Sequence, residues 1–231
     1  MNDVIMLSNV RLSFPHLAEP QRQKNEITGV ERVSYNGEFI MPETDPGFQS
    51  FLQKYGQLAL ADWKEHSQQV MGLITNDRKL RCFGRGEEKI NKKTFQPYDG
   101  YVGQVYITAG KNQQPQVIQA DGKPIDPTNT MLYQQLTRKM YGGCWINAAV
   151  KPWLQNNTHG RAIRCDLIAV QFSKDGDPFG EAPIDTTGMF NQVDEPVAAP
   201  ITPGPAMPAA PFGTPAATPV TPVSLPPFMM Q

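Results

Sequence analysis

One short segment of the sequence concentrates positive charge. From Arg78 to Lys93 the residues RKLRCFGRGEEKINKK include seven Lys or Arg and two Glu, whereas residues 1–77 hold six basic and ten acidic residues. The formal net charge of the whole chain is only −1. A local excess of cations creates a positive field at the surface even where the overall charge is near zero. Such a field attracts phosphate groups, so this segment is a candidate for nucleic-acid binding.

A second stretch, YGGCWINAAVKPW from Tyr141 to Trp153, alternates between two kinds of side chain. The even-numbered positions would form a core face, with Cys144, Ile146, Ala148 and Val150. The other parity carries Trp145, Asn147, Lys151 and Trp153. Successive side chains of a β-strand point to opposite faces, so a strand here would present two indoles and an ammonium group together. Lys151 needs a route to water, which favours an open face.

Both features suit the binding of single-stranded nucleic acid, which needs cations along its phosphates and flat rings beneath its bases. Stacking contributes roughly 1–3 kcal/mol per base. The candidate phosphate contacts are Arg78, Lys79, Arg81, Arg85, Lys89, Lys92, Lys93, Lys151 and Arg164, and the candidate stacking side chains are Phe95, Tyr98, Trp145 and Trp153. The same residues also fit a solvated basic loop with aromatic side chains in the core, and the sequence leaves both interpretations open.

The sequence offers little for catalysis or metal binding. There is no Cys-x-x-Cys pair, and the three histidines, His16, His66 and His159, are isolated from one another. Cys144 and Cys165 occupy core parity, where burial raises the pKa of a thiol and makes it a poor nucleophile. The carboxylates are scattered, and FGRGEEK lacks the Gly-Lys-Ser/Thr ending of a phosphate loop. We therefore expect no catalytic residue, no metal, no cofactor and no enzymatic activity.

Hydrophobic periodicity predicts the elements that would position these residues. The first strand, VIMLSNVRLSF, would bury Val4, Met6, Val10, Leu12 and Phe14, and Pro15 and Pro20 would bracket a loop after it. Residues 32–42 would form one kinked strand or a small hairpin that turns at Asn36-Gly37, and we favour the single strand. Apolar residues at helical spacing predict a long helix over residues 44–72, interrupted at Gly56, with a buried stripe of Phe48, Phe51, Leu52, Tyr55, Ala59, Trp63, His66 and Val70.

The second half of the chain predicts strands around one shorter helix. A third strand spans Gly100 to Gly110, a short strand begins at Gln116, and a helix capped by Thr128 or Asn129 ends at Gly142. The alternating stretch then pairs with Arg161 to Phe172 as a hairpin, with Ile163, Cys165, Leu167 and Ala169 on its core face and Arg164 and Asp166 on the other. We therefore expect a mainly β fold, a five-stranded Greek-key barrel of the oligonucleotide/oligosaccharide-binding (OB) type.

The C-terminal segment has the composition of a disordered tail. From Pro196 to Gln231 it is rich in proline and has no charged residue. We predict a folded domain over residues 1–190 and a disordered tail over residues 191–231. The absence of a long apolar run or a secretory leader predicts a chain without a membrane segment that works in a reducing compartment.

Four stretches together resemble a family of tailed-bacteriophage single-stranded DNA-binding proteins with an OB fold. They are NVRLSFPHLAEP, FIMPETDPGFQSF, YGGCWINAAV and AIRCDLIAVQFSKDGDPFG, and their order and spacing extend the resemblance from about Leu7 to Gly180. The resemblance implies a barrel that coats single-stranded DNA without sequence preference or catalysis, during phage DNA replication and recombination in the cytoplasm of the infected bacterial host. The binding surface would include the basic segment and the outward face of the last hairpin.

The tail departs from the pattern that the resemblance implies. Many such proteins end in an acidic tail that competes with DNA, but this tail is uncharged from Pro196 onward. Leu225 and Phe228, in LPPFMMQ, could instead contact a phage or host replication protein, or the tail could serve only as a solubilising extension. Two other functions stay open: a virion or assembly protein whose barrel face binds protein, and a nucleic-acid enzyme. The sequence does not define the oligomeric state.

Overall fold

The computed structural model describes residues 3–24, 29–126, 128–158 and 160–180. The chain is mainly β, with strands β1 (Ile5–Lys24), β2 (Glu31–Met41), β3 (Phe83–Arg85), β4 (Val105–Lys111), β5 (Gln116–Ile118), β6 (Trp145–Asn157) and β7 (Gly160–Lys174). Its helices are α1 (Pro46–Trp63), α2 (Ser67–Asn76) and α3 (Thr130–Arg138), and short 3₁₀ turns lie at Lys64–His66, Arg78–Leu80 and Gly86–Glu88. Among the described residues, no helix is long and apolar enough to cross a membrane.

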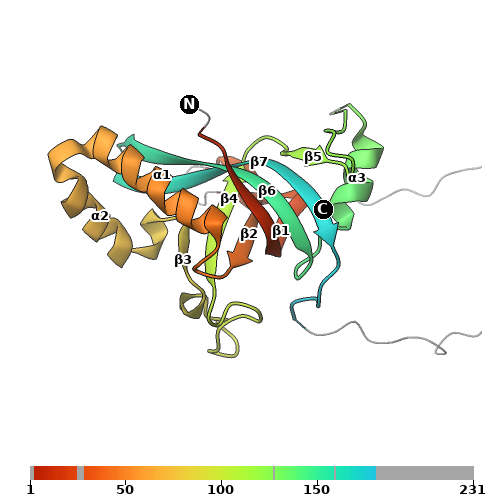
Figure 1. The fold of residues 1–231 in the computed structure, drawn as a ribbon, viewed down its shortest axis with the longest axis horizontal. Coiled ribbons are helices and arrows are strands. Elements are labelled where there is room, and N and C mark those ends of the chain that lie inside the picture. Colours follow the sequence, from red (N-terminus) through yellow and green to blue (C-terminus); the bar gives the residue numbers. More distant parts are fainter. Residues whose placement is uncertain (1–2, 25–28, 127, 159, 181–231) are drawn as a thin grey trace, which may run out of the picture. The chain divides into compact units, whose positions relative to one another are not determined.

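The strands form one mixed sheet in the order β3-β4-β2-β1-β6-β7-β5 (Figure 1). All neighbours are antiparallel except β5 and β7, which pair in parallel. Lys111 Nζ on β4 lies 3.6 Å from Asp166 Oδ2 on β7, although these strands are not neighbours in the sheet. The sheet therefore curves back toward itself. The mainly β class is confirmed. Of the seven strands among the described residues, β1, β2, β4, β6 and β7 correspond to the five predicted long strands, β5 corresponds to the predicted short strand, and β3 is additional.

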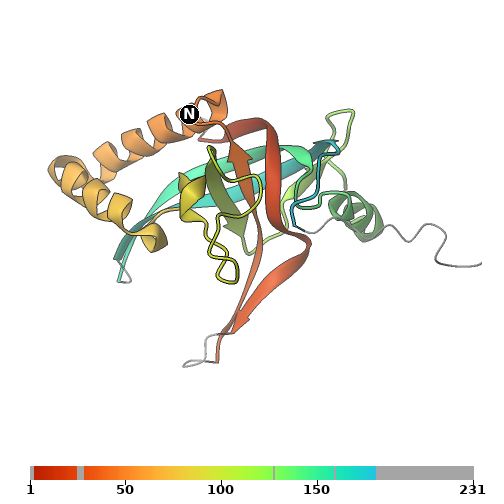
Figure 2. The same ribbon diagram turned by 90° about the horizontal axis from the view of Figure 1, so that it is seen from below.

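The long first strand and its partner form an arm that projects from the rest of the sheet (Figure 2). The sequence predicted a loop beginning at Pro15, but β1 continues to Lys24. Both prolines, Pro15 and Pro20, fall where the pairing with β2 shifts register. Proline has no backbone donor for a sheet ladder and is tolerated at such irregularities, so the strand passes through both.

Register shifts also change which side chains of β1 are buried. Asn9 has a φ of +53°, and the pairing with β6 shifts between Leu7 and Val10. An inserted residue moves the following side chains to the opposite face. Leu7 before this shift and Val10 after it are therefore buried, while Met6 is 56% exposed. Phe14 lies at a second register shift, between Ser13 and His16, has a φ of +44° and is 44% exposed. The prediction that Met6 and Phe14 belong to the core is wrong.

The predicted long helix is two helices. Asp45 caps α1, because its Oδ1 accepts hydrogen bonds of 2.8 Å from Gly47 N and 3.2 Å from Phe48 N. The helix ends at Trp63, and the break falls at Lys64, whose φ is +47°, and not at the predicted Gly56. The chain turns through Lys64–His66 and continues as α2. Most of the predicted stripe is buried, but the His66 side chain is 63% exposed, so its assignment to the core is wrong.

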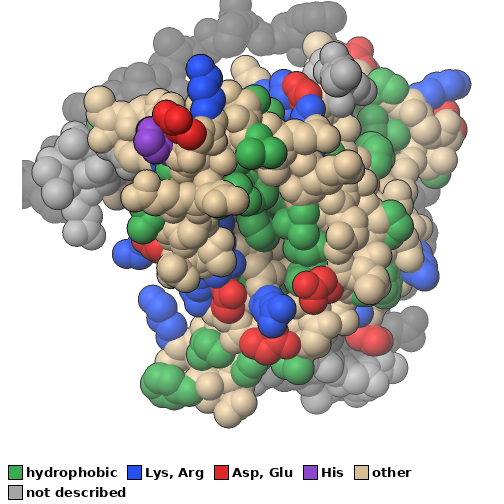
Figure 3. Space-filling model, turned by 60° about the vertical axis from the view of Figure 1, so that its left-hand side comes forward, with side chains coloured by type: hydrophobic (Ala, Val, Ile, Leu, Met, Phe, Trp, Pro, Cys, Tyr) green, Lys and Arg blue, Asp and Glu red, His purple; other side chains and the backbone are tan. Residues whose placement is uncertain are grey.

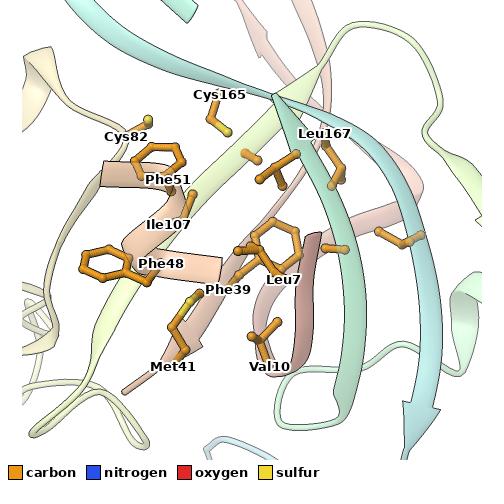
Figure 4. Packing of buried hydrophobic residues seen from close by; sticks show 14 of the residues in the cluster. Leu7, Val10, Phe39, Met41, Phe48, Phe51, Cys82, Ile107, Cys165 and Leu167 are labelled. Carbon is orange, nitrogen blue, oxygen red and sulfur yellow. The ribbon is translucent and has the colours of Figure 1, made fainter. Parts of the chain in front are cut away.

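The core lies between α1 and the inner face of the sheet (Figure 4). Leu7, Phe39 and Ile107 come from three strands of the sheet, and Phe48 and Phe51 come from the helix. Their ring and branched side chains remove a large apolar area from water, which is the main source of stability in such a domain. The same cluster contains Cys82, Cys144 and Cys165.

The predicted hairpin of β6 and β7 is present, and its inner face is largely as predicted. The alternation of Cys144, Ile146, Ala148 and Val150 is confirmed, with each side chain at most 1% exposed. The pairing shifts register between Ala149 and Val150, which leaves Ile168 as an extra residue on β7. Beyond this bulge Val170 continues the inner cluster in place of the predicted Ala169.

Candidate nucleic-acid interface

The basic segment folds over the outer face of β2 and β4. It contains β3 and two 3₁₀ turns, and it continues as a loop that returns to the sheet at Gln104. Gly86 N donates a 2.8 Å hydrogen bond to Gln104 O. A Cβ atom on Gly86 would lie only 1.8 Å from Tyr101 O. The chain can therefore close over the sheet only because residue 86 lacks a side chain.

Glu38 on β2 holds this loop against the sheet. Its carboxylate accepts hydrogen bonds of 2.5 Å from Lys89 Nζ and 2.5 Å from Tyr101 Oη. Lys89 Nζ also lies 4.5 Å from the centre of the Tyr106 ring, a cation–π contact. Burial raises the pKa of Tyr101, and the nearby Glu38 charge raises it further, so the phenol stays a neutral donor. The charge of Lys89 is thus paired within the protein.

A second predicted cation, Arg81, is also paired. Its Nη2 lies 2.8 Å from Glu88 Oε2, its Nη1 donates to Phe83 O at 2.8 Å, and its side chain is only 10% exposed. Arg78 donates to the main-chain carbonyl of Glu88 but stays exposed. The remaining predicted cations of the segment, Lys79, Arg85, Lys92 and Lys93, are exposed. Acidic side chains therefore accompany the basic ones, and Figure 3 shows positively and negatively charged side chains close together on one face of the molecule.

An open pocket of about 400 Å³ lies within the basic segment, and we call it the basic pocket. Its lining includes Arg78, Lys79, Arg81 and Lys89, with Tyr106 and Thr108 from β4 and one acidic residue, Asp77. Arg81 and Lys89 are paired with carboxylates, so the exposed Arg78 and Lys79 are the cations that suit this hollow to an anion such as a phosphate.

The outer face of the hairpin lies against this basic segment. Trp153 and Arg164 are paired across β6 and β7, as are Lys151 and Asp166. Trp153 is 40% exposed, and its Nε1 donates to Asp166 Oδ1 at 2.8 Å. Arg164 Nη1 donates to Lys79 O at 3.0 Å. The prediction that the Trp153 and Lys151 face lies beside Arg164 is confirmed.

Trp145 lies at the other end of β6, away from Trp153. The two residues are eight positions apart, which corresponds to roughly 26 Å along a strand. Trp145 is half-buried between the Arg11 guanidinium at 5.2 Å and Lys174 Nζ at 5.1 Å. The two predicted tryptophans therefore cannot form one continuous stacking platform.

Two further predicted stacking residues lie on the loop after the basic pocket. Phe95 is 79% exposed. Tyr98 is half-buried, and its ring meets the Phe14 ring edge-on at 5.0 Å. Sequence reasoning missed Phe14, because strand alternation assigned it to the core. It also missed Arg11 and Lys174 beside Trp145, whose positions follow from pairing between strands distant in sequence.

The cysteines show no sign of nucleophilic chemistry. Burial raises the pKa of Cys144 to about 12. Burial also raises the pKa of Cys165, which lies beside Cys82. His159, the partner considered for a thiol, lies outside the described residues. Among the residues that the structure describes, no group of three or more His, Cys, Asp and Glu could hold a metal ion.

A curved β-sheet with cations and exposed aromatic rings on its outer face is typical of proteins that bind single-stranded nucleic acid. The family model described as "Enterobacter phage Enc34, ssDNA-binding protein" matches residues 3–197. The chain belongs to this family.

The chain is also similar to individual proteins. Protein p50 of Acyrthosiphon pisum secondary endosymbiont phage 1 is 27% identical over 177 residues, which cover 76% of this chain and 85% of that protein. Two solved structures of the single-stranded DNA-binding protein from bacteriophage Enc34 share the fold. The complex with ssDNA has a TM-score of 0.57 at 23% identity and covers 78% of this chain and 90% of that one. The structure described without ssDNA has a TM-score of 0.55 at 24% identity and covers 82% and 90%.

Proposed function

We propose that this protein binds single-stranded DNA without sequence preference and protects it during phage DNA replication and recombination. The observation that carries the proposal is the junction at which Arg164 of the hairpin meets Lys79 of the basic segment. At this junction exposed cations and the exposed Trp153 ring share one surface. Membership of a family described as ssDNA-binding supports the same function.

The site we propose assigns different roles to the predicted residues. Exposed cations would contact phosphates, together with the half-buried Arg164: Arg78, Lys79, Arg85, Lys92, Lys93 and Lys151. Arg81 and Lys89 are paired with carboxylates and would shape the basic pocket. Trp153, Trp145, Phe95 and Tyr98 would offer stacking surfaces at separate points along the strand. The function requires binding alone, and we infer no catalytic step, metal or cofactor.

We further propose that the curved sheet is an OB-type barrel within a binding domain over residues 1–190, followed by a tail over residues 191–231. The sheet supports this through the approach of β4 to β7. Leu225 and Phe228 lie outside the described residues, and we retain them as a contact for a phage or host replication protein. The place of action that fits this function is the cytoplasm of the infected bacterium.

Titration with poly(dT) at several salt concentrations tests the proposed function. Trp63 is 3% exposed, so any change in tryptophan fluorescence would come mainly from Trp145 and Trp153. We expect quenching, and we expect the affinity to fall steeply with salt because phosphate contacts release counterions. Trp153→Phe should remove part of the quenching. Failure to bind at low salt would reject the proposal, and metal-dependent cleavage of the DNA would favour an enzyme.

A further inference from the structure

A second hollow, of about 610 Å³, lies beside the basic segment, and we call it the aromatic pocket. Its walls include Phe14 of β1, Tyr98 of the loop and Phe179 near the end of the described chain. Asn91, Gln96 and Asp99 add polar groups. Small-molecule sites commonly have volumes of roughly 300–1,000 Å³, apolar walls and a few polar groups. The aromatic pocket has these properties.

The backbone holds two phenylalanines outward at this place. Phe14 has a φ of +44° and is 44% exposed, and Phe95, between the lining residues Thr94 and Gln96, has a φ of +56° and is 79% exposed. A bulky side chain rarely adopts positive φ, and such a conformation costs roughly 1–3 kcal/mol. Here the strained backbone also leaves an apolar ring in water. Neither the strained backbone nor the exposure of these rings improves packing of the core. We therefore expect the exposed rings to have another use.

Hydrogen bonds fix the walls of the aromatic pocket. Tyr98 N donates to Lys89 O at 3.0 Å, and Phe95 N donates to Asn91 O at 2.8 Å. On the opposite wall Phe179 N donates to Gly142 O at 3.0 Å. The Arg11 guanidinium lies 4.6 Å from the centre of the Phe179 ring. The pocket is therefore formed before any ligand enters, which lowers the entropic cost of binding.

Aromatic side chains connect this pocket to the basic pocket. The Tyr98 ring lies 6.2 Å from Tyr101, and Tyr101 lies 6.0 Å from Tyr106. Tyr106 lines the basic pocket. The exposed Lys92 and Lys93 belong to the same loop as Tyr98. A ligand that placed a flat ring in one pocket and phosphates at the other would match this arrangement.

We propose that the aromatic pocket takes a nucleobase of the bound strand, stacked on Phe14 with Tyr98 and Phe179 as side walls. The polar groups of Asn91, Gln96 and Asp99 are available to the edge of the base. This inference rests on the proposed function and adds a specific subsite to it. Phe14 becomes a binding residue, although its parity predicted a place in the core.

Affinity for a fluorescein-labelled dT oligonucleotide tests the subsite in the full-length chain. Phe14→Ala should weaken binding roughly 5- to 150-fold, the factor that corresponds to one lost stacking contact. The dependence of affinity on salt should not change, because no phosphate contact is lost. Phe14→Tyr keeps a ring and should bind like the wild type. Leu73→Ala, which removes a 62%-exposed side chain from α2, is the matched control.

The outcomes separate this inference from the proposed function. If the wild type binds DNA and Phe14→Ala binds equally well, the subsite is wrong while the function stands. If the wild type does not bind, the function itself fails. Photo-crosslinking of the wild type with 5-iododeoxyuridine oligonucleotides gives a readout that does not depend on variant folding. Adducts at Phe14, Tyr98 or Phe179 would support the subsite, and adducts confined to other residues would overturn it.

Discussion

Arg164 on β7 donates a hydrogen bond from Nη1 to the main-chain carbonyl of Lys79, 3.0 Å away. Its Nε donates to Gln155 Oε1 at 3.1 Å. One side chain thus links the closing hairpin to the start of the basic segment and keeps part of its charge at the surface. The planar guanidinium of arginine can donate in two fixed directions at once, whereas the ammonium group of a flexible lysine cannot.

Arg164→Ala should therefore weaken binding of single-stranded DNA by about tenfold, because it removes a charge and releases the basic segment from the hairpin. The control is Arg161→Ala, an exposed residue near the end of the same strand. Fluorescence anisotropy with a dT oligonucleotide measures both. Equal losses for the two variants would mean that Arg164 contributes only its charge.

Charge reversal at Lys92 and Lys93 tests the phosphate contacts without disturbing the fold. Both residues are exposed, whereas reversal at Lys89 would place a second carboxylate beside that of Glu38. The double variant should bind dT, dC and dA oligonucleotides more weakly and to a similar extent. The slope of log affinity against log salt should become shallower by about 1.4, or about 0.7 for each lost phosphate contact.

The control for this charge reversal is Lys139→Glu. Lys139 is an exposed residue that follows α3. A general electrostatic effect would lower affinity in the control as well. An unchanged salt slope in the Lys92 and Lys93 variant would exclude this part of the loop from the DNA contact.

Glu38 should contribute more to stability than an exposed acidic residue does. It pairs with Lys89 and Tyr101, and its side chain is 12% exposed. Glu38→Ala would leave both partners without their acceptor, and we expect a loss of roughly 2–4 kcal/mol in the free energy of unfolding. Glu31→Ala breaks an exposed pair with Arg22 and should cost less than about 1 kcal/mol. Urea denaturation compares them, and similar losses would argue against a central role for Glu38.

Much of the fold was predictable because local patterns agree with tertiary packing. The alternation from Cys144 to Val150 faces a continuous core, and Asp45 and Pro46 mark the start of α1. In these places propensity, capping and burial all favour the same structure. The Trp153 and Lys151 face was also correctly predicted to lie beside Arg164, because β6 and β7 pair as a hairpin.

The errors on the strands have a common physical cause, which is that bulges have no reliable signal in a single sequence. An inserted residue at Asn9 reverses the phase of β1, a second register shift between Ser13 and His16 turns Phe14 outward, and Ile168 has a similar effect on β7. Strict alternation therefore placed Met6 and Phe14 inside. The pairing of Lys89 with Glu38 was equally hidden, because it joins residues 51 positions apart. Charge counts identified the basic segment but could not show which cations remain unpaired.

Two glycines should respond in opposite ways to alanine. At Gly86 a Cβ atom would overlap Tyr101 O, so Gly86→Ala should displace the loop, lower the melting temperature and weaken DNA binding. At Gly72, in α2, nothing lies within 4 Å of the added Cβ. Gly72→Ala should raise stability by about 0.5–1 kcal/mol and leave DNA binding unchanged. Thermal denaturation measures both changes, and a stable Gly86→Ala variant with full affinity would contradict the contact.

The buried Cys144 thiol should make stability fall at alkaline pH. Its pKa is raised from 9.0 to about 12 by burial, so the folded state holds the proton at pH values where the unfolded chain releases it. This contribution is complete below pH 9 and is lost as pH rises toward 12, at up to about 1.4 kcal/mol per pH unit. Cys144→Ala has no such proton, so its stability should fall less between pH 9 and 11 even if it starts lower. Urea denaturation under reducing conditions measures the free energy of unfolding of both proteins as a function of pH. If the two proteins lose stability in parallel, the thiol is already ionised in the folded protein.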